Sequence, residues 1–296
     1  MQTHAADKTH LILLCLFPFM KEMKEIKVRK ESGEFEPYDR SKIENAMTRA
    51  GLSAKAAQEI LSEFEPQLYD NISTKKIFAL LYDLIDREKP EVSHRYNLKH
   101  ALVQLGPAGY EFEDFTARLL SLDGYRTEVR QMLQGRCVMH EVDVVAEDHN
   151  EVLMTECKFH SSGGLKCRIQ VALYTYARFL DLVEGAKLGR CRHLSKPFLV
   201  CNTKFSSDVL EYADCMGFPL LGWHYPFDNG LEALIEKRKC YPISVIPVAS
   251  HVLAKLLAKK IVTVFDLPES ASKLVDMTGI SLQTAKFILE KAEYAR

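Results

Sequence analysis

Two short apolar segments decide how the middle of this 296-residue chain folds: residues 140–146 (HEVDVVA) and residues 152–158 (VLMTECK). Both are rich in Val, Leu and Met, which favours buried strands. The five residues between them, 147–151 (EDHNE), are polar and suit the turn of a hairpin. The sequence therefore predicts a strand hairpin at the centre of a sheet.

This hairpin carries charged residues that a buried strand does not need for packing. Asp143 lies in the first segment, and Glu156 and Lys158 lie two residues apart in the second. Side chains alternate along a strand, so Glu156 and Lys158 share a face, and a hairpin brings Asp143 close to them. Two carboxylates and an ammonium on one surface suit Mg²⁺ or Mn²⁺ and phosphodiester chemistry. The simpler interpretation, a solvated polar face, conflicts with the cost of burying unpaired charge.

The composition is that of an ordinary globular protein, with 47% hydrophobic and 27% charged residues. A net charge of −1 excludes a uniformly basic nucleic-acid binder, so any DNA-binding surface must be local. The eight Cys form no C-x-x-C pair, which disfavours a zinc ribbon and indicates reduced thiols in a cytoplasmic protein. The apolar run at residues 11–19 is too short to cross a membrane, so no membrane association is expected.

The chain is expected to divide into four segments. Residues 1–24 precede the first patterned segment and are interpreted as an extension. Residues 25–105 predict a small β-hairpin followed by helices, and residues 106–228 predict an α/β core with a mixed sheet covered by helices. Residues 229–296 predict an all-α tail with ten basic and seven acidic residues, a net of +3. The overall class is thus α+β, and the stretch GPAG at 106–109 predicts a linker.

Four features of the middle segment follow one another in a recognisable order. They are the helix start with Glu113, then Asp143, then Glu156-x-Lys158, and then Gln170-x-x-x-Tyr174. This order resembles the PD-(D/E)xK nuclease superfamily, and specifically its Mrr-type restriction-endonuclease-like group.

The resemblance to these nucleases implies a metal-dependent DNA endonuclease. It implies that Asp143, Glu156 and Glu113 are the metal ligands. Lys158 would orient the attacking water or stabilise developing charge, and Gln170 would position the phosphate or Lys158. Tyr174, one turn further along the helix, is expected only to pack.

The stretch at residues 28–43 (VRKESGEFEPYDRSKI) combines a short strand, a glycine turn and a helix start. It resembles the ATP-cone, the regulatory nucleotide-binding domain of ribonucleotide reductases. The resemblance implies ATP or dATP as an effector, and assembly of copies through the cones. The residues implied to line the nucleotide site are Val28, Lys30, Glu36, Asp39, Lys42 and Thr74. The simpler interpretation is a solvated, lysine-rich hairpin.

The tail contains the stretch MTGISLQTAKFI at residues 277–288. It resembles a helix-hairpin-helix element, which would offer backbone N–H groups to a DNA phosphate. A plain helical cap on the core is an equally good interpretation of the pattern.

Together these features predict a cytoplasmic, Mg²⁺-dependent DNA endonuclease that is regulated by nucleotide. Three alternatives stay open: a catalytically silent, nucleotide-responsive DNA-binding regulator, an RNA-directed enzyme, and a structural protein with an inactive core. The intact Asp143, Glu156 and Lys158 disfavour the first and the third.

Overall fold

The computed structural model describes residues 26–295, apart from residues 31, 107–108 and 163. The expected extension at residues 1–24, with its apolar run at 11–19, lies outside this part. The chain forms two compact units. The N-terminal unit comprises the chain up to Thr48 together with Ser53–Leu84, and the C-terminal unit comprises Arg49–Leu52 together with the chain from Ile85 onwards.

The N-terminal unit is built on a small sheet of order β2-β1-β3. The predicted hairpin forms, and the two-residue strand β3, which the sequence did not reveal, adds parallel to β1. The elements that begin in this unit are β1 (Lys27–Arg29), β2 (Phe35–Pro37), α1 (Arg40–Arg49), α2 (Ala54–Phe64), η1 (Glu65–Gln67), β3 (Ile72–Ser73) and α3 (Thr74–Glu88).

Side-chain caps fix where the first two helices begin. Asp39 Oδ1 accepts a hydrogen bond from the backbone N–H of Ser41 at 3.0 Å, at the start of α1. Ser53 Oγ accepts one from Ala56 N at 3.2 Å, at the start of α2. Each cap satisfies a donor that the first turn of a helix leaves free, as the sequence predicted.

The C-terminal unit contains a five-stranded mixed sheet of order β10-β8-β6-β5-β4. Strands β4, β5 and β6 are antiparallel, and β6, β8 and β10 are parallel. Its elements are α4 (Pro90–Val103), α5 (Tyr110–Leu122), β4 (Arg126–Gln134), β5 (Met139–Glu147), β6 (Val152–Lys158), β7 (Lys166–Cys167), α6 (Ile169–Lys187), β8 (Lys196–Cys201), β9 (Lys204–Phe205), α7 (Ser207–Met216), β10 (Leu220–Leu221), α8 (Leu231–Arg238), η2 (Ile243–Val245), α9 (Ser250–Ala258), η3 (Val264–Asp266), α10 (Ala271–Thr278) and α11 (Leu282–Ala295).

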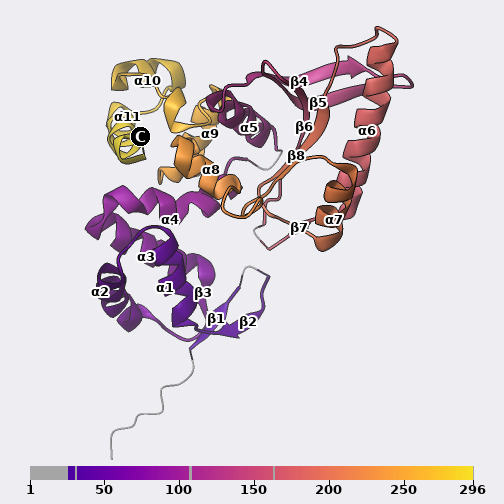
Figure 1. Cartoon of the computed structure of the whole chain (residues 1–296). Helices are drawn as coiled ribbons and strands as arrows, with labels where there is room; N and C mark the ends of the chain where they lie inside the picture. The colour runs from indigo at the N-terminus through magenta and orange to yellow at the C-terminus, as the bar shows by residue number, and fades with distance from the viewer. Residues whose placement is uncertain (1–25, 31, 107–108, 163, 296) are drawn as a thin grey trace, which may run out of the picture. The chain divides into compact units, whose positions relative to one another are not determined.

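Helices cover both faces of this sheet (Figure 1). On one face, Val144 of β5 and Leu153 of β6 pack with Leu120 of α5. On the other, Val145 and Met154 from the same strands pack with residues of α6. Both faces are therefore buried, which explains the near-continuous apolar runs of the central hairpin.

The edge strand β4 is the main element that the sequence did not predict. Its nine residues, RTEVRQMLQ, alternate poorly and carry three charges. It pairs only with β5, at the edge of the sheet. An edge strand with a solvated side needs little apolar pattern, so its sequence resembles that of a loop.

The structure divides the chain differently from the four predicted segments. Helix α4, expected in the first domain, and the tail, expected as a separate module, both belong to the core of the C-terminal unit. Residues 107–108 of the predicted linker lie outside the described residues, and the helices on either side of it, α4 and α5, belong to one unit. The shared core includes Leu98 and Leu102 of α4, Phe112 and Phe115 of α5, and Leu274, Ala285 and Ile288 of the tail.

Because the tail shares this core, Ile288→Ala should destabilise the whole C-terminal unit. The side chain of Ile288 is 0% exposed, and such a truncation costs about 2–5 kcal/mol. Urea unfolding followed by circular dichroism should show one shifted transition for the sheet and the tail. Lys286→Ala, an exposed neighbour on the same helix, should leave it unshifted. A separate early transition that spares the sheet would instead indicate an independent tail.

Candidate functional site

Asp143 lies where the two strands of the central hairpin part. The regular pairing of β5 with β6 ends at Val144 opposite Thr155, and the pairing with β4 also skips Asp143. Asp143 Oδ2 accepts the backbone N–H of Cys157 at 2.7 Å. The carboxylate therefore takes the place of a backbone carbonyl, and this bond fixes it at the opening between the strands.

Glu156, on the neighbouring strand, is held by two side chains of α6. Its Oε1 accepts the Tyr174 hydroxyl at 3.0 Å, and its Oε2 pairs with Arg178 Nη1 at 2.5 Å. The Arg178 guanidinium also lies 5.6 Å from the centroid of the Tyr174 ring. Tyr174 thus does more than pack, which corrects the expectation from sequence. Arg178 is a residue of the site that the sequence did not reveal.

The electrostatics of the site are those of crowded carboxylates. Burial raises the pKa of Asp143 to about 7, and the charge of Glu156 adds to the rise. Glu113 raises it further, while Arg178 and the Cys157 N–H oppose it. Burial also raises the pKa of Glu113. The three predicted carboxylates are therefore close enough to repel one another, and a cation would relieve that repulsion.

Glu113 is tied to the edge strand by Arg130. The guanidinium of Arg130 contacts Glu113 Oε2 at 3.0 Å and Asp114 Oδ1 at 2.5 Å. Lys260, just after α9, pairs with the other oxygen of Asp114 at 2.7 Å. Arg130 has a φ of 51°, a left-handed conformation that is rare for a residue with a side chain and is common at functional sites.

These ion pairs and hydrogen bonds occupy carboxylate oxygens that a bound metal ion would use. Among the residues that the structure describes, no three His, Cys, Asp or Glu side chains are arranged to hold a metal ion. Asp143 and Glu156 provide the hard oxygen donors that Mg²⁺ prefers. Both oxygens of Glu156 already accept hydrogen bonds, so a cation has to replace one of those donors.

Lys158 and Gln170 line a separate part of the site, a cleft of about 580 Å³ between the end of β6 and the start of α6. Lys158 is the last residue of β6, and Gln170 lies in the first turn of α6. The structure thus brings Lys158 and Gln170 together at this cleft. It also brings Asp143 and Glu156 of the sheet together with Glu113 of α5.

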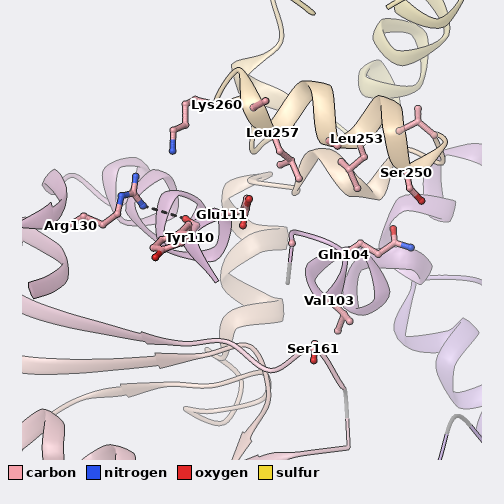
Figure 2. Close-up of a pocket in the computed structure, with 14 residues that line it drawn as sticks. Val103, Gln104, Tyr110, Glu111, Arg130, Ser161, Ser250, Leu253, Leu257 and Lys260 are labelled. Atoms are coloured by element: carbon pink, nitrogen blue, oxygen red, sulfur yellow. Dashed lines mark hydrogen bonds between the residues drawn. The ribbon is translucent and has the colours of Figure 1, made fainter. Parts of the chain in front are cut away.

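A larger pocket of about 810 Å³ lies on the other side of Arg130. In Figure 2, Leu253 and Leu257 of α9 line it opposite Tyr110 and Glu111, and Arg130 Nη1 donates to the Tyr110 carbonyl at 3.4 Å. None of the predicted catalytic residues lines this pocket. Arg130, which lines this pocket and also pairs with Glu113, links it to the carboxylate site.

The predicted nucleotide residues of the N-terminal unit centre on Glu36. Its Oε2 lies 2.9 Å from Lys30 Nζ and 3.2 Å from Lys42 Nζ. Hydrogen bonds from Lys30 and then Lys42 lower the pKa of Glu36, and the bond to Glu36 raises the pKa of Lys30. Two ammonium groups therefore converge on one carboxylate at the surface of the unit.

The other three predicted residues lie around this sheet. Val28 is buried in β1 directly opposite Glu36 in the β1–β2 register. Asp39 caps α1, where the Ser41 hydroxyl is the main cause of its lowered pKa. Thr74 is the first residue of α3. The two lysines and Glu36 are in contact. Asp39 and Thr74 instead lie at the starts of α1 and α3, the helices that follow β2 and β3 in the chain.

Comparisons with known proteins agree with part of this picture. Residues 26–98 match the ATP cone domain, which supports nucleotide binding by this part of the chain. An Archaeoglobus fulgidus protein described as uncharacterized is 36% identical over 177 residues, which are 60% of this chain and 97% of that protein. This chain belongs to the same family as that protein.

A solved structure is similar to this chain in both sequence and fold. The crystal structure of a protein of unknown function, AF1548, is 37% identical and aligns with a TM-score of 0.54. The alignment covers 62% of this chain and 96% of the other. Separately, no helix in the described part of the chain is long and apolar enough to cross a membrane.

Replacing the half-buried carboxyl, Asp143→Asn, should stabilise the protein at pH 8. The folded-state pKa of about 7 lies above the ordinary value of 3.8, so the carboxylate opposes folding increasingly as pH rises from about 4 to 7. We expect a gain on the order of 2 kcal/mol at pH 8 that falls by more than half at pH 5. Urea unfolding in EDTA measures both values.

Asp214→Asn, at an exposed position on α7, is the matched control and should change neither measurement. An Asp143→Asn variant that is less stable than the parent at both pH values would show that the Cys157 N–H bond outweighs the charge repulsion.

Proposed function

We propose that the C-terminal unit is a divalent-metal-dependent nuclease that hydrolyses phosphodiester bonds in DNA. The observation that carries the proposal is the pair Asp143, which is half-buried, and Glu156, which is buried, at a break in the strand pairing. Buried like charges destabilise a fold, and sites of catalysis are where such perturbed groups concentrate. The cleft with Lys158 and Gln170 opens beside them.

In this proposal each residue has a defined part. Asp143 and Glu156 would hold Mg²⁺ or Mn²⁺, with Glu113 as a third carboxylate. The bound metal would supply an activated water and neutralise phosphate charge. Lys158 would bind a non-bridging phosphate oxygen from the cleft side.

The residues that contact the carboxylates would control their orientation. Tyr174 and Arg178 fix the plane of the Glu156 carboxylate. Arg178 offsets the charge of Glu156 through their ion pair. Arg130 pairs with Glu113 from the edge strand and opposes the rise in its pKa that burial causes.

Cleavage of supercoiled plasmid tests the proposal. The protein should nick the plasmid with Mg²⁺ or Mn²⁺ and not with EDTA. Asp143→Ala and Lys158→Ala should each lower the rate on the order of 100-fold or more, because each removes a charge that acts on the transition state. Lys187→Ala, which loses a surface pair with Glu184, should cleave normally. Full cleavage by either site variant would refute the mechanism.

A second candidate is a catalytically silent, nucleotide-responsive DNA-binding regulator. The observation that favours it is that Arg178 and Tyr174 occupy both oxygens of Glu156. Calorimetry with Mn²⁺ separates the two functions. Binding that is lost in Asp143→Ala supports the nuclease, whereas DNA binding without any Mn²⁺ binding supports the regulator.

For the N-terminal unit we infer an effector site for ATP or dATP. Glu36 shields Lys30 and Lys42 in the absence of ligand, and a triphosphate offers both lysines more negative charge than one carboxylate does. A nucleotide can regulate cleavage only if it binds two states of the protein with different affinity. Assembly of copies through the cones would supply the second state.

ATP or dATP should therefore raise the melting temperature of the N-terminal unit within the full chain. At 100 times the dissociation constant the stabilisation is about 2.7 kcal/mol. Lys42→Ala should abolish both this shift and any change in oligomeric state. Lys55→Ala, an exposed residue of α2 in the same unit, is the control. No binding by calorimetry at millimolar nucleotide would remove the regulatory role.

The tail has a related role in this proposal. Helices α10 and α11 are joined at Gly279, whose φ of 65° makes the tight turn. We propose that this helix-hairpin-helix-like turn offers the N-terminal N–H groups of α11 to a DNA phosphate.

A further inference from the structure

The two short strands β7 and β9 carry an unusual pair of lysines. They run parallel, and Lys166 lies directly opposite Lys204 in their register. The next pair, Cys167 and Phe205, is buried, whereas both lysines are exposed. Cys167 and Phe205 belong to the core under α7. The core thus fixes the backbone of both strands, and both lysines face solvent.

This pair of lysines has no counter-charge in the described structure. Paired strands lie about 4.8 Å apart, and like charges directly opposite each other destabilise a sheet. The ion pairs among the described residues include neither Lys166 nor Lys204, nor the neighbouring Arg168. A bound anion would turn the repulsion between the two lysines into attraction to the ligand, so this arrangement favours anion binding.

The lysine pair adjoins the cleft that contains Lys158. Lys158, Lys166 and Arg168 all line this cleft, and its neutral lining includes Gln170 and Ser206. No Asp or Glu is found among the described residues that line it. This lining therefore has at least three positive charges and no negative one, in a chain whose net charge is only −1. This is a local cationic surface of the kind that binds a polyanion.

We propose that this cationic cleft, lined by Lys158, Lys166 and Arg168, together with Lys204, which lies opposite Lys166 on the neighbouring strand, binds the sugar–phosphate backbone of DNA beside the bond to be cut. The inference rests on the proposed nuclease function, because Lys158 belongs to both sites. One phosphodiester carries a single negative charge. Four cationic side chains therefore match the charge of several consecutive phosphates better than that of a single phosphate. Gln170 supplies a neutral donor, which suits a phosphate oxygen without regard to base sequence.

DNA binding in EDTA tests the cleft without any cleavage. A fluorescent duplex is titrated by anisotropy at several salt concentrations with the full chain, with Lys166→Gln/Lys204→Gln, and with the control Lys187→Gln. Each lost phosphate contact lowers the salt slope of log K by about 0.9, so the double variant should lose about 1.8 and bind on the order of tenfold more weakly. The control should match the parent.

A second measurement maps the contact. Neutral methylphosphonate links are placed one at a time along one strand. The parent should lose affinity at adjacent positions, and the double variant should lose none there. The double variant should also melt no lower than the parent without DNA, because it removes a repulsive pair. A parent-like slope, or an unchanged methylphosphonate profile, would overturn the proposal, as would a slope change seen only with RNA.

These outcomes are distinguishable from failure of the nuclease proposal. If the parent binds with the lysine-dependent slope but never cleaves, the cleft stands and the nuclease function falls. If the parent cleaves and the double variant binds as the parent does, the nuclease function stands and the cleft assignment falls.

Discussion

The separation of β5 from β6 at Asp143 is the constraint on which the site depends. Up to Val144 the strands pair regularly and bury apolar side chains on both faces. At Asp143 a carboxylate replaces a backbone acceptor, and Glu156 lies beside it. Helix α5 brings Glu113 to the same opening because its apolar face is fixed on the sheet. The surrounding core thus holds the three carboxylates together against their mutual repulsion.

Two arginines make this crowding tolerable. Arg178 contacts Glu156 from α6, and Arg130 contacts Glu113 from the edge strand. Among the described residues, Asp143 receives a backbone N–H from Cys157 and the weaker field of Arg178, and its pKa rises to about 7. A cation that binds here competes with both arginines for the carboxylates. Its binding free energy therefore equals that of the new metal–carboxylate contacts minus that of the arginine ion pairs that are lost.

The sequence was informative where local rules act and silent where tertiary contacts decide. The central hairpin, the caps at Asp39 and Ser53, and most helix starts followed from patterns a few residues long. The edge strand β4 was missed because one-sided burial leaves little apolar signal, and Arg130 was missed with it. Arg178 was missed because its role depends on how α6 packs, which a single helix sequence does not specify. The shared core of α4 and the tail was missed for the same reason, since packing joins them over a long sequence separation.

The charge pattern of the C-terminal unit also separates two regions that the sequence merged into one motif. Glu156 and Lys158 are two residues apart, yet Glu156 is enclosed by side chains of α6, whereas Lys158 opens into a cleft without carboxylates. Between Glu156 and Lys158, two residues apart at the end of β6, the surroundings thus change from a negative region to a positive one. Phosphodiester cleavage uses both regions. The negative region would hold a metal cation at the scissile phosphate, and the positive region would contact the adjacent phosphates. Under the proposed nuclease function, that juxtaposition would supply both charges locally, without an excess of positive charge over the whole molecule.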